Sequence, residues 1–242
     1  MNDVSAGIGR LAHAAADHPP VKQAKIGVLL ANLGTPDGYD YWSMRRYLSE
    51  FLSDKRVVDI ANWKWQPLLQ LIILSKRPFT SGANYKLIWN HEKGESPLMT
   101  ITKDQTAAIA AAMQAAHGDQ VMVDFAMRYG NPSMESVLKK LEAKGMERLL
   151  ILPLYPQYSA TTTASTFDEV FRIVSGWRNQ PELRLIKHYH DHPSYINALK
   201  EQVESYWQSH GRPDFAAGDK LLFSFHGVPK RTLDKGDPYH CE

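Results

Sequence analysis

The sequence is poor in several features that would mark a specialised class of protein. It has one cysteine, Cys241, among 242 residues, which excludes an internal disulfide framework and a metal site built from several cysteines. No apolar run reaches the roughly 18 residues that a membrane-spanning helix needs. Lys and Arg number 28 against 26 Asp and Glu, without any basic block, so we expect no nucleic-acid partner. With 43% hydrophobic residues, the chain is typical of a globular protein, and we expect it in the cytoplasm.

Common catalytic and nucleotide-binding motifs are also missing. The Gly-Ile-Gly at 7–9 follows no predicted strand, so it is not a dinucleotide fingerprint. No G-x-S-x-G elbow follows a strand, so Ser224 beside His226 is not a hydrolase arrangement. Residues 1–25 are rich in alanine and polar residues and lack an apolar signal core, which predicts a disordered tail. A generic nucleotide-binding enzyme is therefore disfavoured.

What the sequence does contain is an alternation of short apolar runs and longer helical patterns. Runs that are almost continuously apolar are typical of strands buried on both faces of a parallel sheet. The predicted strands are 26–33, 121–127, 148–155, 183–189 and 221–225. The predicted helices are 40–54, 102–118, 133–145, 163–178 and 193–211. This alternation predicts an α/β fold with a parallel sheet.

A long insertion separates the first two predicted strands. Residues 39–101 exceed what a simple crossover requires, so we expect them to form a lid or the wall of a pocket. Within the insertion, 63–74 is aromatic and apolar with little polar face. It could be a core helix, which we favour, or an exposed apolar lip that contacts a membrane or a greasy ligand.

The carboxyl ends of parallel strands share one edge of the sheet, where ligands bind. Glycine, proline, aromatic and single charged residues follow the predicted strands there. The segments concerned are 32–36, 128–132, 155–159 and 226–229. Their composition predicts a pocket for a flat, largely apolar molecule held by a few polar anchors.

Each residue at this edge has a structural and a functional interpretation. His226 follows an apolar run and precedes a glycine, which favours a functional histidine over one that only completes a strand end. Arg128 could anchor an anion or pair with a surface carboxylate. Tyr129 and Tyr158 could pack in the core or contact a ligand. The hydroxyl residues between 161 and 165 are expected to cap the following helix.

A histidine cluster precedes the helix at 193–211. His188, His190 and His192 surround Asp191 at a spacing that could suit a metal ion. The alternative, which we favour, is a strand end whose Asp191 or His192 caps the helix that begins at Pro193.

Several of these stretches together resemble the ferrochelatase family, whose members insert ferrous iron into protoporphyrin IX and release two protons. The matching stretches are LLANLGTP, SKRPF…NYKLIW, AMRYGNPS, LPLYPQYSATTTAS and LLFSFHGVPKRTLDKGDPYHCE. The resemblance implies a chelatase-like, two-lobed Rossmann-type architecture with the tetrapyrrole between the lobes. On this basis 26–190 would form the first lobe and 191–242 the beginning of an incomplete second lobe.

The resemblance also assigns roles to individual residues. His226 matches the catalytic histidine, which would also bind the metal, and a second, acidic ligand is expected in a C-terminal segment that this sequence does not include. The residues that match porphyrin contacts are Leu33, Arg77, Tyr85, Ser96, Arg128 and Tyr158. Some relatives hold an iron–sulfur cluster on cysteines. Here Ala160 follows YPQYS and Cys241 is the one cysteine, so no such cluster is expected.

These inferences predict a fragment of a ferrochelatase whose activity as an isolated chain is doubtful. The substrates would be protoporphyrin and ferrous iron, and peripheral membrane contact is compatible with the apolar insertion. Two alternatives remain open: a non-catalytic tetrapyrrole-binding module, and a chelatase for cobalt or coproporphyrin, since histidine and carboxylate ligands accept several divalent ions. The sequence leaves the oligomeric state open.

Overall fold

The computed structural model describes residues 23–242, which divide into two compact units. The first unit contains the described residues through Leu154 together with Ala160–Ile186. The second unit contains Tyr155–Ser159 and Lys187–Glu242. The tail predicted at 1–25 lies almost wholly outside the described residues, and Lys25 already begins the first strand.

The first unit is built on a four-stranded sheet in which every pairing is parallel. Its strands are β1 (Lys25–Thr35), β2 (Val121–Gly130), β3 (Met146–Pro153) and β4 (Glu182–Leu185), in the order β2-β1-β3-β4. The α/β class and the parallel sheet are therefore confirmed. The prediction of a strand at 183–189 was too long, because the pairing of β3 with β4 ends at Ile151 and Leu185.

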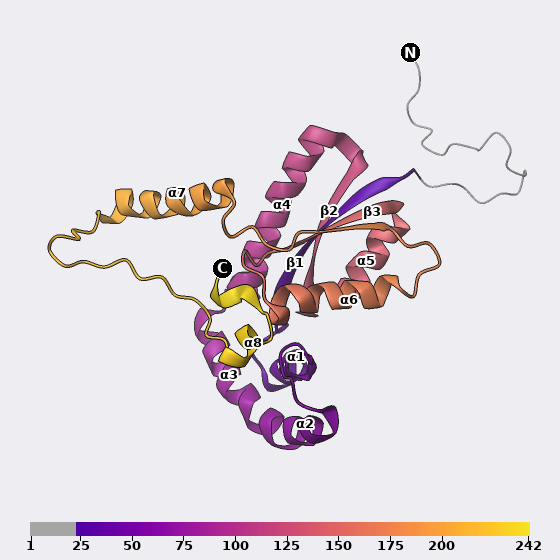
Figure 1. Ribbon diagram of the computed structural model, residues 1–242, viewed down its shortest axis with the longest axis horizontal. Helices are drawn as coiled ribbons and strands as arrows, with labels where there is room; N and C mark the ends of the chain where they lie inside the picture. The colour runs from indigo at the N-terminus through magenta and orange to yellow at the C-terminus, as the bar shows by residue number, and fades with distance from the viewer. Residues whose placement is uncertain (1–22) are drawn as a thin grey trace, which may run out of the picture. The chain divides into compact units, whose positions relative to one another are not determined.

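Helices cover both faces of this sheet (Figure 1). Alternate side chains of β1 point to opposite faces, as the pleat of a strand requires. Leu29 and Ala31 pack with α5 (Met134–Ala143) and α6 (Ser165–Val174) in one core cluster. On the other face, the Asn32 amide donates a hydrogen bond of 2.9 Å to Thr102 of the long helix α4. The remaining helical segments of this unit's sheet region are α4 (Pro97–His117), the 3-10 turn η2 (Gly118–Gln120) and the π-helical turn η3 (Ala160–Ala164).

The insertion between β1 and β2 forms a second core cluster in the same unit. Its helical segments are α1 (Tyr41–Ser53), α2 (Asn62–Leu68), the π-helical turn η1 (Leu69–Ile73) and α3 (Leu74–Ile88). Leu69 and Leu74 are fully buried against α1, whereas Trp63 and Leu71 are each 75% exposed. The prediction of a core helix at 63–74 thus holds for one side of the segment and is wrong for the other.

Gly34 near the end of β1 is required by the close approach of β2. Its φ is +114°, a conformation that side-chain-bearing residues rarely adopt. A Cβ atom at this position would lie 1.8 Å from the carbonyl oxygen of Tyr129. The glycine therefore sets how closely the two strands meet at the carboxyl edge of the sheet.

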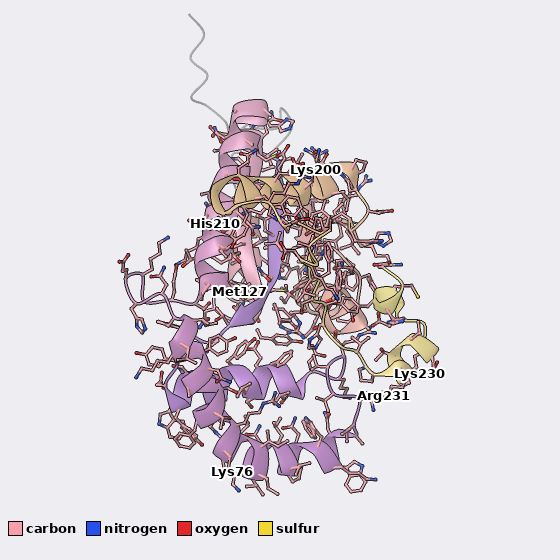
Figure 2. All side chains as sticks on the ribbon, turned by 90° about the vertical axis from the view of Figure 1, so that its left-hand side faces the viewer. Lys76, Met127, Lys200, His210, Lys230 and Arg231 are labelled. Carbon is pink, nitrogen blue, oxygen red and sulfur yellow. The ribbon has the colours of Figure 1, made fainter. Side chains whose placement is uncertain are left out.

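The second unit contains α7 (Pro193–His210), the short helix α8 (Lys230–Asp234) and the 3-10 turn η4 (Pro238–His240). In Figure 2, Lys200 and His210 lie on α7, and Lys230 and Arg231 lie at the start of α8. The strand predicted at 221–225 is wrong: this segment pairs with no strand among the described residues, and Leu222 is 86% exposed. An apolar run becomes a strand only where a neighbour accepts its backbone hydrogen bonds, and local sequence does not report that neighbour.

Candidate functional site

The residues predicted for the site fall in both compact units. The first unit carries Leu33, Arg77, Tyr85, Ser96 and Arg128, and the second carries Tyr158 and His226.

Arg128 on β2 belongs to a largely buried polar network centred on Asp54, which follows α1. The guanidinium contacts the Asp54 carboxylate at 2.6 Å and also donates to the Ser165 hydroxyl at 2.7 Å. Tyr129 and Ser165 donate further hydrogen bonds to the same carboxylate oxygen, at 2.8 and 2.5 Å. The guanidinium carbon also lies 4.5 Å from the centre of the Tyr129 ring. Arg128 therefore has an internal anionic partner already.

This network changes the titration of both acids in it. Burial raises the pKa of Asp54, but hydrogen bonds from Ser165, Arg56 and Tyr129, with the charge of Arg128, outweigh burial and leave that pKa lowered. Burial raises the pKa of the Tyr129 hydroxyl, so it remains a hydrogen-bond donor. Asp54 is thus ionised at neutral pH and holds Arg128 in one orientation.

A groove of about 710 Å³ opens beside the network. Charged side chains of α1 and β2 contribute to its lining, among them Arg45, Glu50, Asp54 and Arg128. Glu50 accepts a hydrogen bond of 2.9 Å from the Gly130 backbone N–H, and burial raises its pKa. Sequence reasoning missed Asp54 and Glu50. The available signal was an acidic residue at the end of the predicted helix 40–54, inside the insertion expected to shape a pocket.

Ser165, the first residue of α6, does not behave as expected. Ala164 precedes the helix and provides no side-chain cap, while the Ser165 hydroxyl bonds Asp54. The capping prediction is therefore wrong for Ser165, because a buried carboxylate is a stronger partner for its hydroxyl than a helix N–H.

Leu33 and Tyr85 both pack against the core cluster of the insertion. Both are half-buried and pack against the cluster that includes Tyr47 and Tyr129. Arg77 is exposed on α3, about two turns before Tyr85. These three residues provide an apolar wall and a cation on neighbouring parts of the first unit.

Ser96 is buried and begins α4. Its hydroxyl accepts a hydrogen bond of 3.2 Å from the Met99 N–H, as an N-cap residue does. It borders a hollow of about 270 Å³ that is also lined by Thr35 and Lys103. This hollow does not include Arg128, so the structure places Ser96 and Arg128 on different cavities of the first unit.

In the second unit, His226 is exposed in the unpaired segment that precedes α8. Its backbone N–H donates a hydrogen bond of 3.2 Å to the Tyr239 hydroxyl, which ties the segment to η4. The Tyr158 N–H donates to the Glu242 carboxylate at 2.7 Å, and the Lys187 ammonium lies 5.0 Å from the centre of the Tyr158 ring. The contact with Tyr239 thus holds the backbone of His226. The contacts with Glu242 and Lys187 hold Tyr158.

One histidine of the cluster before α7 acts as predicted. His192 is the N-cap of α7, and its Nδ1 accepts a hydrogen bond of 3.2 Å from the Ser194 N–H. The capping interpretation is confirmed for His192. His188 and His190 have a different environment, which is described below.

Comparison with known proteins gives the family of the chain. The family model described as Ferrochelatase matches residues 25–242, which includes both compact units. The chain belongs to the ferrochelatase family. A ferrochelatase of Rhodobacter capsulatus is 57% identical over 234 residues, which are 96% of this chain and 65% of that relative. The chain therefore spans just under two thirds of the length of this ferrochelatase.

Among residues 23–242, no helix combines the length and the apolar character that crossing a membrane requires.

Proposed function

We propose that this chain carries the substrate-handling part of a ferrochelatase, which inserts Fe²⁺ into protoporphyrin IX to form protohaem. The observation that supports the proposal is the family match over residues 25–242, which extends through the SFHGVP segment that holds His226. The proposed insertion of a metal into a porphyrin sets what the chemistry requires.

The reaction replaces two pyrrole N–H protons by one divalent metal ion. The porphyrin enters as a neutral ring with two N–H groups, and the product is a neutral metalloporphyrin together with two protons. A base must accept those protons as the metal–nitrogen bonds form. We assign this role to the imidazole of His226, because a neutral imidazole accepts a proton near neutral pH and does not need to be deprotonated first.

The proposed porphyrin contacts divide by chemistry. Leu33 and Tyr85 form part of an apolar wall that suits the face of a macrocycle. Arg77 offers an exposed cation for a propionate. The Ser96 hydroxyl accepts from Met99 and retains its own hydrogen, which it can donate to a carboxylate.

Arg128 has a different role in this proposal from the one its sequence position suggests. Because Asp54 already neutralises the guanidinium, a propionate would have to displace or share that carboxylate. We therefore assign Arg128 to positioning β2 and Tyr129 at the edge of the groove, and we assign propionate binding to Arg77 and Ser96. Tyr158 is proposed as a ring contact that is supplied by the second unit.

The proposal is tested by metal insertion into protoporphyrin IX, followed as loss of free-porphyrin fluorescence after Fe²⁺ or Zn²⁺ is added. The assay uses the 242-residue chain and a chimera that adds the unmatched residues of the Rhodobacter capsulatus relative. His226→Ala should slow insertion by about 100-fold or more, the usual contribution of a general base. The matched control is His240→Ala, an exposed histidine of the same unit, which should leave the rate unchanged.

Three outcomes decide between the alternatives. Equal rates for the parent and His226→Ala proteins would contradict the role of His226. A Soret shift on porphyrin titration with no metal insertion in the chimera would support a tetrapyrrole-binding module instead. Faster insertion of Co²⁺, or of any metal into coproporphyrin, would redirect the substrate assignment. The proposed reaction uses no iron–sulfur cluster, and its site of action is proposed to be cytoplasmic.

A further inference from the structure

Two histidines and a carboxylate that have no assigned role in the proposed metal insertion meet in the second unit. His188 Nδ1 lies 2.7 Å from Glu242 Oε1, and His190 Nδ1 lies 3.6 Å from Glu242 Oε2. The rings of the two histidines are in edge contact, with their centres 5.2 Å apart. One ligand-type atom from each of the three side chains lies within 4.8 Å of the others.

The His190 ring nitrogen is the unusual member of this group. Nδ1 is buried, yet it has no hydrogen-bond partner among the described residues. A buried imidazole nitrogen without a partner is costly, so such atoms commonly mark a place where a water or an ion belongs. The nearest anionic atom is the Glu242 oxygen at 3.6 Å, which is beyond hydrogen-bond length.

Glu242 is held in place by hydrogen bonds. The Tyr158 N–H donates to Oε2 at 2.7 Å while His188 contacts Oε1, so both carboxylate oxygens are oriented. The carboxylate therefore faces both imidazoles.

We propose that His188, His190 and Glu242 form a binding site for a divalent transition-metal ion, separate from His226. Two imidazole nitrogens and one carboxylate oxygen suit Zn²⁺ and similar first-row ions, whereas Mg²⁺ and Ca²⁺ prefer ligand sets made of oxygen. Three protein ligands leave a position for water or another exchangeable ligand.

Only a small rearrangement is needed to admit the ion. Ligand atoms that each lie about 2.0–2.1 Å from Zn²⁺ are about 3.3 Å apart in a tetrahedral site. The His190–Glu242 distance of 3.6 Å is already close to this value. The 2.7 Å contact between His188 and Glu242 must lengthen, and the ion replaces the proton that this hydrogen bond shares.

The site uses a different set of side chains from the proposed metal-insertion reaction. Its members come from the segment before α7 and from the residue after η4, and His226 is not among them. A His226→Ala background therefore tests the site without any contribution from the proposed catalytic histidine. Failure of one proposal does not imply failure of the other.

The test is Co²⁺ and Zn²⁺ binding to the 242-residue chain that carries His226→Ala. We expect visible d–d absorption at one Co²⁺ per chain, which stoichiometric Zn²⁺ displaces. His190→Gln and Glu242→Gln should each weaken Zn²⁺ binding by at least about 100-fold, because even residues behind a metal ligand commonly contribute 10–100-fold. His210→Ala is the control, since His210 is an exposed histidine on α7 outside the cluster, and it should bind Zn²⁺ like the parent (Figure 2).

The outcomes are distinguishable. Unchanged Zn²⁺ affinity in His190→Gln and Glu242→Gln would overturn the proposal, as would loss of stoichiometric Co²⁺ binding caused by His226→Ala alone. Glu242→Gln also weakens the contact with Tyr158, so His190→Gln is the decisive variant: its Nδ1 has no hydrogen bond to lose within the described chain. A normal far-UV spectrum together with lost Zn²⁺ binding in His190→Gln would support the site.

Discussion

The two compact units differ in what holds them together. Every buried hydrophobic side chain among the described residues belongs to the first unit, and most of them fall in two core clusters. The helices of the second unit bury no side chain, and α7 leaves Ile196, Leu199 and Tyr206 about half exposed. The second unit is held together by hydrogen bonds, such as those from the Ser159 hydroxyl to Asp237 and from the Tyr158 N–H to Glu242. Apolar burial thus specifies the first unit, and a few hydrogen bonds specify the second.

The largest loss of stability in the first unit is expected from a substitution at Gly34. Gly34→Ala places a methyl group against the Tyr129 carbonyl oxygen and imposes an unfavourable φ, so we expect a loss of about 4 kcal/mol or more in the free energy of unfolding. Gly118→Ala is the control: its φ is also positive, at +59°, but nothing lies within 4 Å of the added atom. We expect it to cost about 1–2 kcal/mol in urea unfolding. Equal costs at the two positions would contradict the close approach of β1 and β2.

A core truncation compares the units directly. Leu149 on β3 is fully buried, and Leu149→Ala should lower the free energy of unfolding by about 3 kcal/mol. Leu222 in the second unit is 86% exposed, so Leu222→Ala should change it by less than about 0.5 kcal/mol. Peptide-resolved hydrogen exchange would show reduced protection of β1 amides in the first variant, with α7 amides unaffected. A similar loss of protection in both units would mean that they unfold together.

A substitution at Asp54 measures how much a buried polar network contributes to the stability of the first unit. Asp54→Asn removes the charge that faces Arg128, and we expect a loss of about 2 kcal/mol at pH 7. Because the folded-state pKa of Asp54 is lowered from its usual 3.8, its contribution is complete above that value and is lost as pH falls through the lower folded value. The difference in urea midpoint between parent and variant should therefore shrink at pH 3. A difference that is independent of pH would contradict the ionised network.

The smallest effect is expected at the surface of the first unit. Arg56 and Asp168 form a 2.7 Å ion pair, but their side chains are 45% and 49% exposed. Arg56→Ala should therefore cost less than about 1 kcal/mol, and salt should reduce that cost further. A thermal melt at low and high ionic strength measures both. A larger loss that salt does not reduce would contradict the small contribution expected of an exposed ion pair.

The elements that could be predicted from sequence are strands whose neighbours in the sheet are also apolar runs, and helices with a clear helical pattern. β1, β2 and β3 are apolar runs in which β1 pairs with both β2 and β3. α4, α5 and α7 have helical patterns, although α4 begins at Pro97 rather than at the predicted residue 102. The segment 221–225 has the same apolar signal as these strands but no neighbour in the described chain, so composition alone was misleading there. The exposed side of 63–74 escaped prediction for a similar reason, because an apolar run does not reveal which of its faces is covered.

The site was predicted residue by residue, and its pairings were not. Arg128 was expected to anchor an anion or to pair with a surface carboxylate. Its partner is the largely buried Asp54, which lies 74 residues earlier and becomes a neighbour only when α1 packs beside β2. His188 and His190 were assigned with His192 to a strand end, because the sequence gives no sign that Glu242 returns to them. Contacts between segments that are distant in the sequence depend on the tertiary structure. The pattern of a single sequence indicates only local structure.

The place of β1 in the sheet has a consequence for how the chain is made. Of the four described strands, β1 is synthesised first, yet its two partners begin at Val121 and Met146. During synthesis, the run that contains Leu29 and Leu30 keeps its backbone hydrogen-bonding groups unpaired and its apolar side chains exposed. This lasts until the whole insertion has emerged. The nascent polypeptide should therefore engage a holding chaperone early and be released once β2 docks.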